Sequence, residues 1–157
     1  MVILQRKGEP LSESEIRQLE EQLGHRIPSE YRSFLREHDG GVPKVNTFPI
    51  PGTENASGVN EYLSAARILA AREQYGGRLA HGLVPVAVAE GGNLVCLDLS
   101  DGSVVFWDHE FEDSDPVQFL ARSFDRFRQM LEPFDPGSVE LKPGQVKSVW
   151  VDPDLLK

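Results

Sequence analysis

The chain has 157 residues and a mass of 17.5 kDa, a usual length for one domain with its own core. Its 25 acidic residues outnumber 16 basic ones, giving a formal net charge of −9 and a sequence pI of about 4.9. This balance argues against nucleic acid and anionic membranes as ligands, because both are bound through a basic face. No apolar run reaches the ~20 residues that span a bilayer, and the apolar stretch at the amino terminus is too short for a signal peptide. The single cysteine, Cys96, cannot form an intrachain disulfide, so we expect a cytoplasmic protein.

Two short helices are predicted near the amino terminus. Ser12 and Glu15 have the spacing of a capping box, and Gly24 suits the left-handed residue that closes a helix. A second helix is expected to begin at Pro28, whose fixed φ and missing N–H suit a first turn, and to end at Gly40-Gly41. The short connection between the two helices predicts a packed pair. Their apolar faces comprise Ile16, Leu19, Leu23, Tyr31, Phe34 and Leu35.

The middle of the chain predicts a strand, a loop, a helix and then a strand meander. Residues 45–50 alternate as a short strand, residues 51–58 have the composition of a loop, and residues 59–75 fit a third helix. Connections short enough for antiparallel hairpins then join three strand-like runs, at 83–89, 93–99 and 103–108.

The end of the chain predicts one more helix and a possible hairpin. A fourth helix is expected over residues 123–131, and two alternating arms at 138–142 and 146–151 fit a last hairpin. We therefore expect a single α+β domain over residues 1–157. It would hold a mainly antiparallel sheet of about five to six strands, with about four helices packed around it.

The negative charge is concentrated in the second part of the chain. Residues 1–97 hold 12 acidic and 10 basic residues, whereas residues 98–157 hold 13 and 6. The stretch 98–115 has no Lys or Arg, and its acids are Asp98, Asp101, Asp108, Glu110, Glu112, Asp113 and Asp115. We consider three interpretations: a solvated rim of turns, a docking surface for a basic partner, and a carboxylate metal site. Residues 98–102 do not fit a calcium loop, because the glycine stands fifth rather than sixth.

A search for catalytic motifs finds none. No histidine stands four residues from another, and one cysteine cannot begin a thiolate zinc site. The cluster Asp108-His109-Glu110 would place its histidine on the opposite strand face from its two acids. Neither a Gly-x-Ser-x-Gly elbow nor a phosphate-binding glycine loop is present. We therefore assign no catalytic residue, cofactor or metal ligand, and we interpret Cys96 as an inert buried thiol.

The two tryptophans suggest different roles. Trp107 ends a predicted strand beside Val105, so core packing is its first interpretation. Its place against the acidic run allows a second role, as an aromatic anchor in an interface. Trp150 lies in a polar tail, where it would either hold the tail to the body or lie exposed.

Two blocks of sequence carry a family resemblance. The first is an acidic helix followed by Ile27-Pro28-x-x-Tyr31 and then Asp39-Gly40-Gly41. The second contains the strand-like runs over 83–110 and then Ser123-Phe124-Asp125-x-Phe127. In this order and spacing, the blocks resemble the SUKH superfamily, which includes yeast cell-wall assembly regulators and many bacterial immunity proteins. The resemblance covers about residues 11–131, with Ile27 for the common Leu and Asp39 for the common Asn.

The resemblance implies an α+β fold and a binding function rather than a catalytic one. Bacterial members typically bind and neutralise a cognate secreted toxin, often a nuclease, and eukaryotic relatives act in regulation. The leading hypothesis is an immunity protein that occludes a basic toxin domain. The alternatives are a regulatory or scaffold module without a toxin partner, and an enzyme or small-molecule binder. The expected partner-facing residues are Trp107, Asp108, Glu110, Glu112, Asp113 and Asp115.

Overall fold

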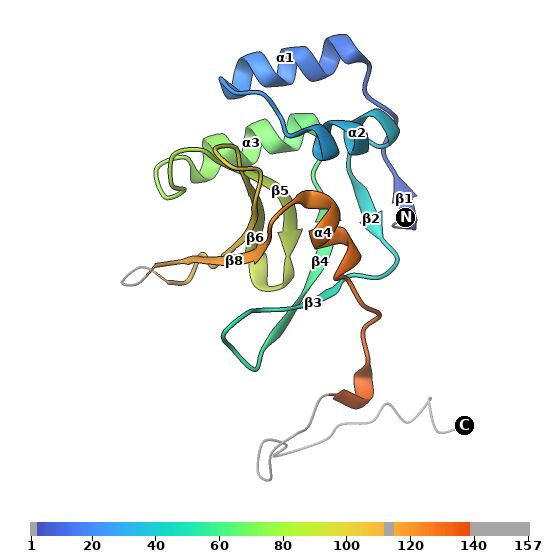
Figure 1. The fold of residues 1–157 in the computed structure, drawn as a ribbon, viewed down its shortest axis with the longest axis vertical. Helices are drawn as coiled ribbons and strands as arrows, with labels where there is room; N and C mark the ends of the chain where they lie inside the picture. Colours follow the sequence, from blue (N-terminus) through green and yellow to red (C-terminus); the bar gives the residue numbers. More distant parts are fainter. Residues whose placement is uncertain (1–2, 112–114, 139–157) are drawn as a thin grey trace, which may run out of the picture.

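The computed structural model describes residues 3–111 and 115–138, which form an α+β domain (Figure 1). Its helices are α1 (Glu13–Leu23), α2 (Ser29–Glu37), α3 (Ala65–Tyr75) and α4 (Phe124–Gln129), with short 3₁₀ turns at Glu90–Gly92 and Pro136–Ser138. Its strands are β1 (Leu4–Lys7), β2 (Gly41–Pro43), β3 (Thr47–Pro49), β4 (Ala56–Tyr62), β5 (Leu83–Ala89), β6 (Leu94–Asp98), β7 (Val104–Trp107) and β8 (Val117–Ala121). Within these described ranges, no helix has the length and apolarity needed to cross a membrane.

The strands form one antiparallel sheet, as the sequence predicts. Their order is β1-β2-β4-β5-β6-β7-β8, and β3 pairs with β4 off this path. The registers Val84↔Leu97 and Val95↔Phe106 confirm the two predicted hairpins of the meander. The sheet has eight strands rather than five to six, because β1, β2, β4 and β8 were not predicted.

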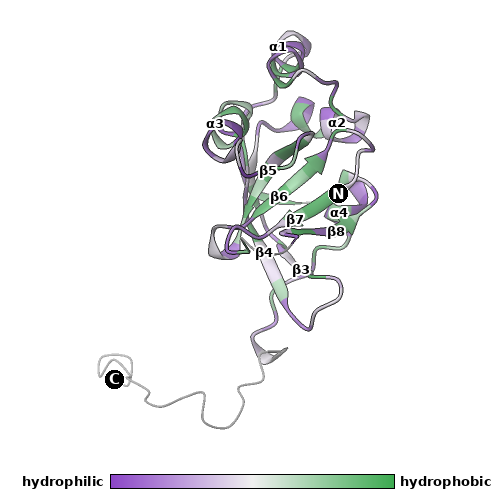
Figure 2. Ribbon diagram, turned by 90° about the vertical axis from the view of Figure 1, so that its left-hand side faces the viewer, coloured by the Kyte–Doolittle hydropathy of each residue, from purple (hydrophilic) through white to green (hydrophobic). Residues whose placement is uncertain are grey.

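Apolar residues cover both faces of the central strands. Along β7, Val104 and Phe106 belong to the main core, whereas Val105 and Trp107 belong to a second, smaller cluster. Because successive side chains on a strand point to opposite faces, the two clusters lie on the two sides of the sheet. Figure 2 shows the apolar strands between α3 on one side and α2 and α4 on the other. This burial on both faces explains why β6 is apolar at consecutive positions.

The first two helices form for the reasons that the sequence gives. The Ser12 side chain accepts a hydrogen bond from the Glu15 backbone N–H, and the Glu15 carboxylate accepts one from the Ser12 backbone. Gly24 closes α1 in the left-handed region at φ 74°. The second helix follows Pro28 and ends at Glu37, three residues before Gly40. Gly40 instead lets the backbone pass close to the end of β4. Its φ is +80°, and a Cβ on it would lie only 2.7 Å from the Tyr62 carbonyl oxygen.

The predicted third helix was wrong over its first six residues. Residues 59–64 belong to β4 and its connection, and α3 begins at Ala65 after its N-cap Ser64. Val59 and Tyr62 are both buried in the main core at a helix-like spacing of three residues, which β4 achieves through a shift in its register with β5 between Val59 and Glu61. Pairing with β5 decided between the two structures. Within α3, Ile68 is buried, whereas Ala66 and Ala70 are exposed.

The closing segments gave mixed outcomes. The fourth helix is confirmed, with Ser123 as its N-cap and with Phe124 and Phe127 buried. The strand β8, which follows the acidic run and completes one edge of the sheet, was not predicted. The predicted tail hairpin lies, apart from Ser138, outside the described residues, as does Trp150.

Candidate functional site

The acidic run over residues 98–115 is divided between two ends of the sheet. Asp98 ends β6 and Asp101 lies in the β6–β7 turn, whereas Asp108 and Asp115 lie after β7. The first turn lies beside α2, since a Cβ at Gly102 would lie 3.7 Å from the Pro28 ring. The carboxylates in the run therefore do not form one surface, because β7 separates them along its length.

Three connections meet at the end of the sheet that holds Asp108. They are the β3–β4 turn, the 3₁₀ turn Glu90–Gly92 and the β7–β8 connection. The Asn93 side-chain oxygen accepts a hydrogen bond from the His109 N–H at 3.1 Å, which joins the second connection to the third. We call this region the acidic end, and its described carboxylates are Glu54, Glu90, Asp108, Glu110 and Asp115. None of these five carboxylates forms an ion pair with a residue in the described ranges.

The carboxylates of the β7–β8 connection are held by its own backbone. Asp108 Oδ1 accepts a hydrogen bond from the Glu110 N–H at 3.0 Å, and Asp115 Oδ1 accepts one from the Val117 N–H at 3.1 Å. The Arg78 guanidinium donates to the His109 carbonyl oxygen and supports the connection without pairing with an acid. These bonds fix the turn and leave a second oxygen of each aspartate for a partner. Glu112 and Asp113, which were also predicted to face the partner, lie outside the described residues.

A pocket of about 230 Å³ opens between the β3–β4 turn and the β7–β8 connection. Its apolar walls are Ile50, Phe106, Phe111 and Pro116. Its polar lining comprises Thr53, Asn55, Gln118, Asp108 and Asp115. Phe111 is 56% exposed at the wall of this pocket, so its ring adds accessible apolar surface there. The acidic end thus combines negative charge with an apolar hollow.

Trp107 is buried on the opposite face of the sheet from Phe106, which lines the pocket. Only 1% of the area of Trp107 is exposed, and its ring packs edge-on against Tyr75 at 5.4 Å between centroids. The Arg78 guanidinium lies over the indole, 5.2 Å from its centroid. Trp107 therefore packs in the smaller apolar cluster and supports the connection that follows it, and its role as an anchor in a partner interface stays a prediction.

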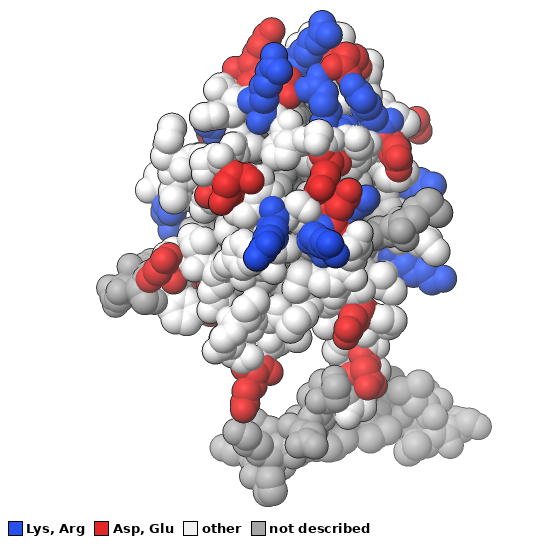
Figure 3. Space-filling model, viewed as in Figure 1, with Lys and Arg blue, Asp and Glu red and all other residues white. Residues whose placement is uncertain are grey.

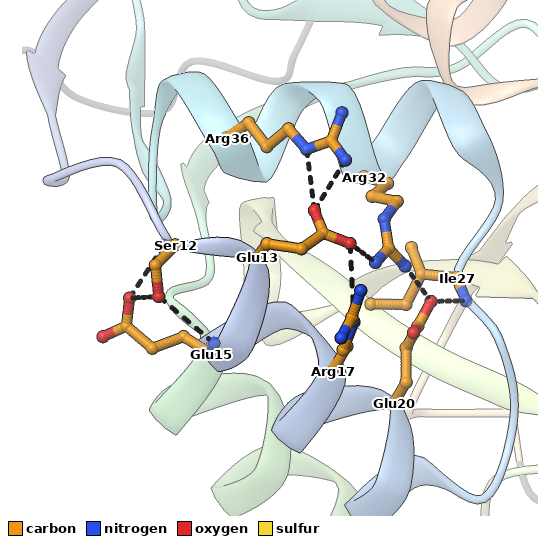
Figure 4. Close-up of polar contacts among 8 residues, drawn as sticks. All are labelled: Ser12, Glu13, Glu15, Arg17, Glu20, Ile27, Arg32 and Arg36. Atoms are coloured by element: carbon orange, nitrogen blue, oxygen red, sulfur yellow. Dashed lines mark hydrogen bonds and ion pairs between the residues drawn. The ribbon is translucent and has the colours of Figure 1, made fainter.

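The helical end of the molecule, formed by α1 and α2, uses its carboxylates differently (Figure 4). Glu13 pairs with Arg32 and with Arg36, whose Nη2 lies 2.6 Å from Glu13 Oε2. Glu20 pairs with Arg32 at 2.5 Å and also accepts a hydrogen bond from the Ile27 N–H at 3.0 Å. The hydrogen bonds from Arg36 and then Arg32 lower the pKa of Glu13 to about 2. Because Glu13 and Glu20 make these contacts, they join α1 to α2 and to the turn between the two helices.

The two ends of the surface differ in their charged side chains. Figure 3 shows Lys and Arg mixed with Asp and Glu over the helical part of this face, whereas the lower end of the described surface shows Asp and Glu without Lys or Arg. The net charge of −9 is therefore a poor description of any one face. A basic partner would be attracted to the acidic end, where no described Lys or Arg pairs with the carboxylates.

The described residues offer little for metal or thiol chemistry. No three His, Cys, Asp or Glu residues among them lie close enough together to hold a metal ion. Cys96 is fully buried, and burial raises the pKa of its thiol, so it stays protonated at neutral pH.

Comparison with known proteins identifies the family. The model of the SMI1/KNR4 family (SUKH-1) matches residues 10–130, which is most of the chain. The chain is also 26% identical over 167 aligned residues to a protein of Bacillus subtilis (strain 168) that is described as an SPbeta prophage-derived uncharacterized protein, YokK. That alignment covers 90% of this chain and 85% of the relative. The chain belongs to the SMI1/KNR4 family, as its resemblance to the SUKH superfamily predicts.

The acidic residues of this region are recognisable in the sequence, whereas the pocket beside them is not. The acidic run indicated Asp108, Glu110 and Asp115, which the structure places on one connection. The wall that Ile50, Thr53 and Asn55 supply was missed, because these residues come from a loop some sixty positions earlier in the chain. The only signal for it was an alternating strand running into Pro51-Gly52, which predicts a turn and says nothing about its neighbours.

Proposed function

We propose that this protein is a non-catalytic immunity protein that binds a basic toxin domain through its acidic end and blocks it. The observation that carries the proposal is that none of the five described carboxylates of this end is paired with a cation of the described ranges. Unpaired surface carboxylates gathered at one end attract a basic partner over distance and select against acidic ones. Family membership supports a binding role, since many SUKH proteins protect bacteria from toxins.

Blocking would work by occupation and charge. Toxins that cleave nucleic acid carry a cationic cleft for phosphate, and a surface of carboxylates competes for that cleft. Glu13 and Glu20 of the helical end would take no direct part, because arginines of the same fold already pair with them. The family fold alone does not name the toxin, because one scaffold can present many different surfaces.

Co-expression with the toxin domain encoded beside this gene tests the proposal. We expect the protein to restore growth of cells that express that domain and to co-purify with it. A variant with Asp108, Glu110 and Asp115 changed to Lys should lose protection. The matched control changes Glu9, Glu21 and Glu73 to Lys, which gives the same charge change at exposed positions elsewhere and should protect like the natural protein.

Two results would contradict the proposal. If neither growth nor co-purification depends on this protein, it has no toxin partner there, and a regulatory module becomes the better description. If both triple variants lose protection equally, the total charge matters and the acidic end does not.

A further inference from the structure

The pocket at the acidic end has the size and lining for one long side chain. Its volume of about 230 Å³ is below the roughly 300–1,000 Å³ of typical small-molecule sites. Apolar surface from Ile50, Phe106 and Pro116 lines it, and no cation is among its lining residues. A side chain with an apolar stem and a charged tip matches such a lining, because the stem gains from burial while the tip stays near polar groups.

The carboxylates of the pocket define the charge of that tip. Asp108 and Asp115 both line the pocket, and each has one oxygen bonded to a backbone N–H two residues along. Neither forms an ion pair with a described residue, in contrast to Glu13, Glu20, Glu61 and Asp125, which all pair with arginines. A cation placed in the pocket would therefore meet two carboxylates without displacing an existing partner.

The exposed ring of Phe111 narrows the choice of cation. More than half of this side chain is exposed at the pocket wall, so its face can be covered by a partner. A guanidinium is planar, stacks on aromatic faces and binds carboxylates through paired N–H groups, whereas an ammonium is a compact and strongly hydrated charge. Arginine fits this combination of an aromatic wall and two aspartates better than lysine.

We propose that this pocket receives an arginine side chain of the basic partner, with its stem along Ile50 and Pro116, its guanidinium against Phe111 and its N–H groups on Asp108 and Asp115. This inference deepens the proposed function and rests on it for the identity of the partner as a protein. Three features together favour an arginine side chain in this pocket: the apolar walls, the exposed ring, and the two carboxylates that pair with no described cation.

Titration of the full chain with small peptides, followed by amide and methyl NMR shifts, tests the proposal without the partner. The probes are the blocked tripeptides Gly-Arg-Gly, Gly-Lys-Gly and Gly-citrulline-Gly. We expect the arginine peptide to give saturating shifts at Phe111, Val117 and Ile50. The lysine peptide should bind about 2- to 5-fold more weakly, because it lacks the stacking contribution. The citrulline peptide has the same shape without the charge and should give no saturating shift.

A matched pair of variants separates the pocket from general charge. Asp115→Asn and Asp101→Asn remove the same charge, and each aspartate accepts a hydrogen bond from the N–H two residues along, which asparagine can retain. We expect Asp115→Asn to weaken the arginine peptide about 2- to 5-fold, and Asp101→Asn to leave its binding unchanged. Phe111→Ala should weaken binding by a similar factor, since the exposed ring contributes little to folding.

The outcomes distinguish this inference from the proposed function. Arginine and citrulline peptides that behave alike, or shifts spread over the surface, would overturn the pocket, even if toxin protection is observed. Equal effects of Asp115→Asn and Asp101→Asn would also overturn it. Selective arginine binding in a protein that gives no toxin protection would support the pocket and overturn only the proposed partner.

Discussion

The two ends of this molecule use carboxylates for opposite purposes. At the helical end, Glu13 and Glu20 lie within ion-pair distance of Arg32, and Glu13 also pairs with Arg36, so their charge joins α1 to α2. At the acidic end, Asp108 and Asp115 hold only the backbone of their own connection. The difference shows that the number of acidic residues in a stretch says little about how many carboxylates a partner can bind. What matters is whether the fold supplies a cation for each.

The largest expected effect concerns the buried residue that supports the connection after β7. Trp107→Ala removes a fully buried side chain that packs against Tyr75, and we expect it to lower the free energy of unfolding by about 3–5 kcal/mol. Urea unfolding measures this loss. A variant with natural stability and lost partner binding would show instead that Trp107 is an interface anchor.

Charge reversal at the acidic end should act on association. We expect the variant with Asp108, Glu110 and Asp115 changed to Lys to bind the toxin domain about 10- to 100-fold more slowly at low salt, because attraction becomes repulsion. Stopped-flow mixing at two ionic strengths measures the rate. If the association rate changes neither with the variant nor with the salt concentration, electrostatic attraction at the acidic end does not drive association.

Loss of a cation at the helical end should act on folding instead. Arg32→Ala leaves Glu13 and Glu20 without a shared partner, although Glu20 keeps its bond from the Ile27 N–H. We expect a loss of about 1–2 kcal/mol in the free energy of unfolding, measured by urea titration, and unchanged binding. Arg126→Ala is a control, since this exposed arginine of α4 forms no ion pair with a described residue. Equal losses in both variants would show that the pairs at the helical end contribute nothing special.

The ion pairs of Glu13 should also make the stability of the protein depend on pH, because they lower the pKa of this carboxyl group. Hydrogen bonds from Arg36 and Arg32 lower the pKa of Glu13 from 4.5 to about 2. A depressed carboxyl pKa contributes stability above the unfolded value and loses it as the pH falls toward the folded value. We expect stability to fall between pH 4.5 and 2, and Arg36→Gln to flatten this dependence. Identical slopes for both proteins, measured by urea unfolding across that range, would contradict the assignment.

The smallest effect is expected from neutralising the acidic end. Glu110→Gln with Asp115→Asn removes two carboxylates that pair with no described cation. The free energy of unfolding should therefore either increase or stay within about 0.5 kcal/mol of the natural value. Thermal unfolding measures the change. A clear loss of stability would mean that these carboxylates hold the fold, as those at the helical end do.

Much of the fold followed from local signals. Ser12, Gly24 and Ser123 mark helix ends through hydrogen bonds with near neighbours, so their effect could be read without knowing the rest of the chain. The hairpins of β5, β6 and β7 were also predictable, because their connections are short. In contrast, residues 59–64 suit a helix or a strand, and only their pairing with β5 decided between them.

The features of the candidate site also fall into two groups, those that local sequence determines and those that long-range contacts determine. The sequence by itself determined the family, the α+β class and the run of acids that contains Asp108 and Asp115, because these depend on residue identity and on near spacing. The tertiary structure decided that β7 separates this run into two groups, that arginines of α2 pair with Glu13 and Glu20, and that the β3–β4 turn completes a pocket beside Phe111. Each of these depends on contacts between residues far apart in the chain, which composition and periodicity do not encode.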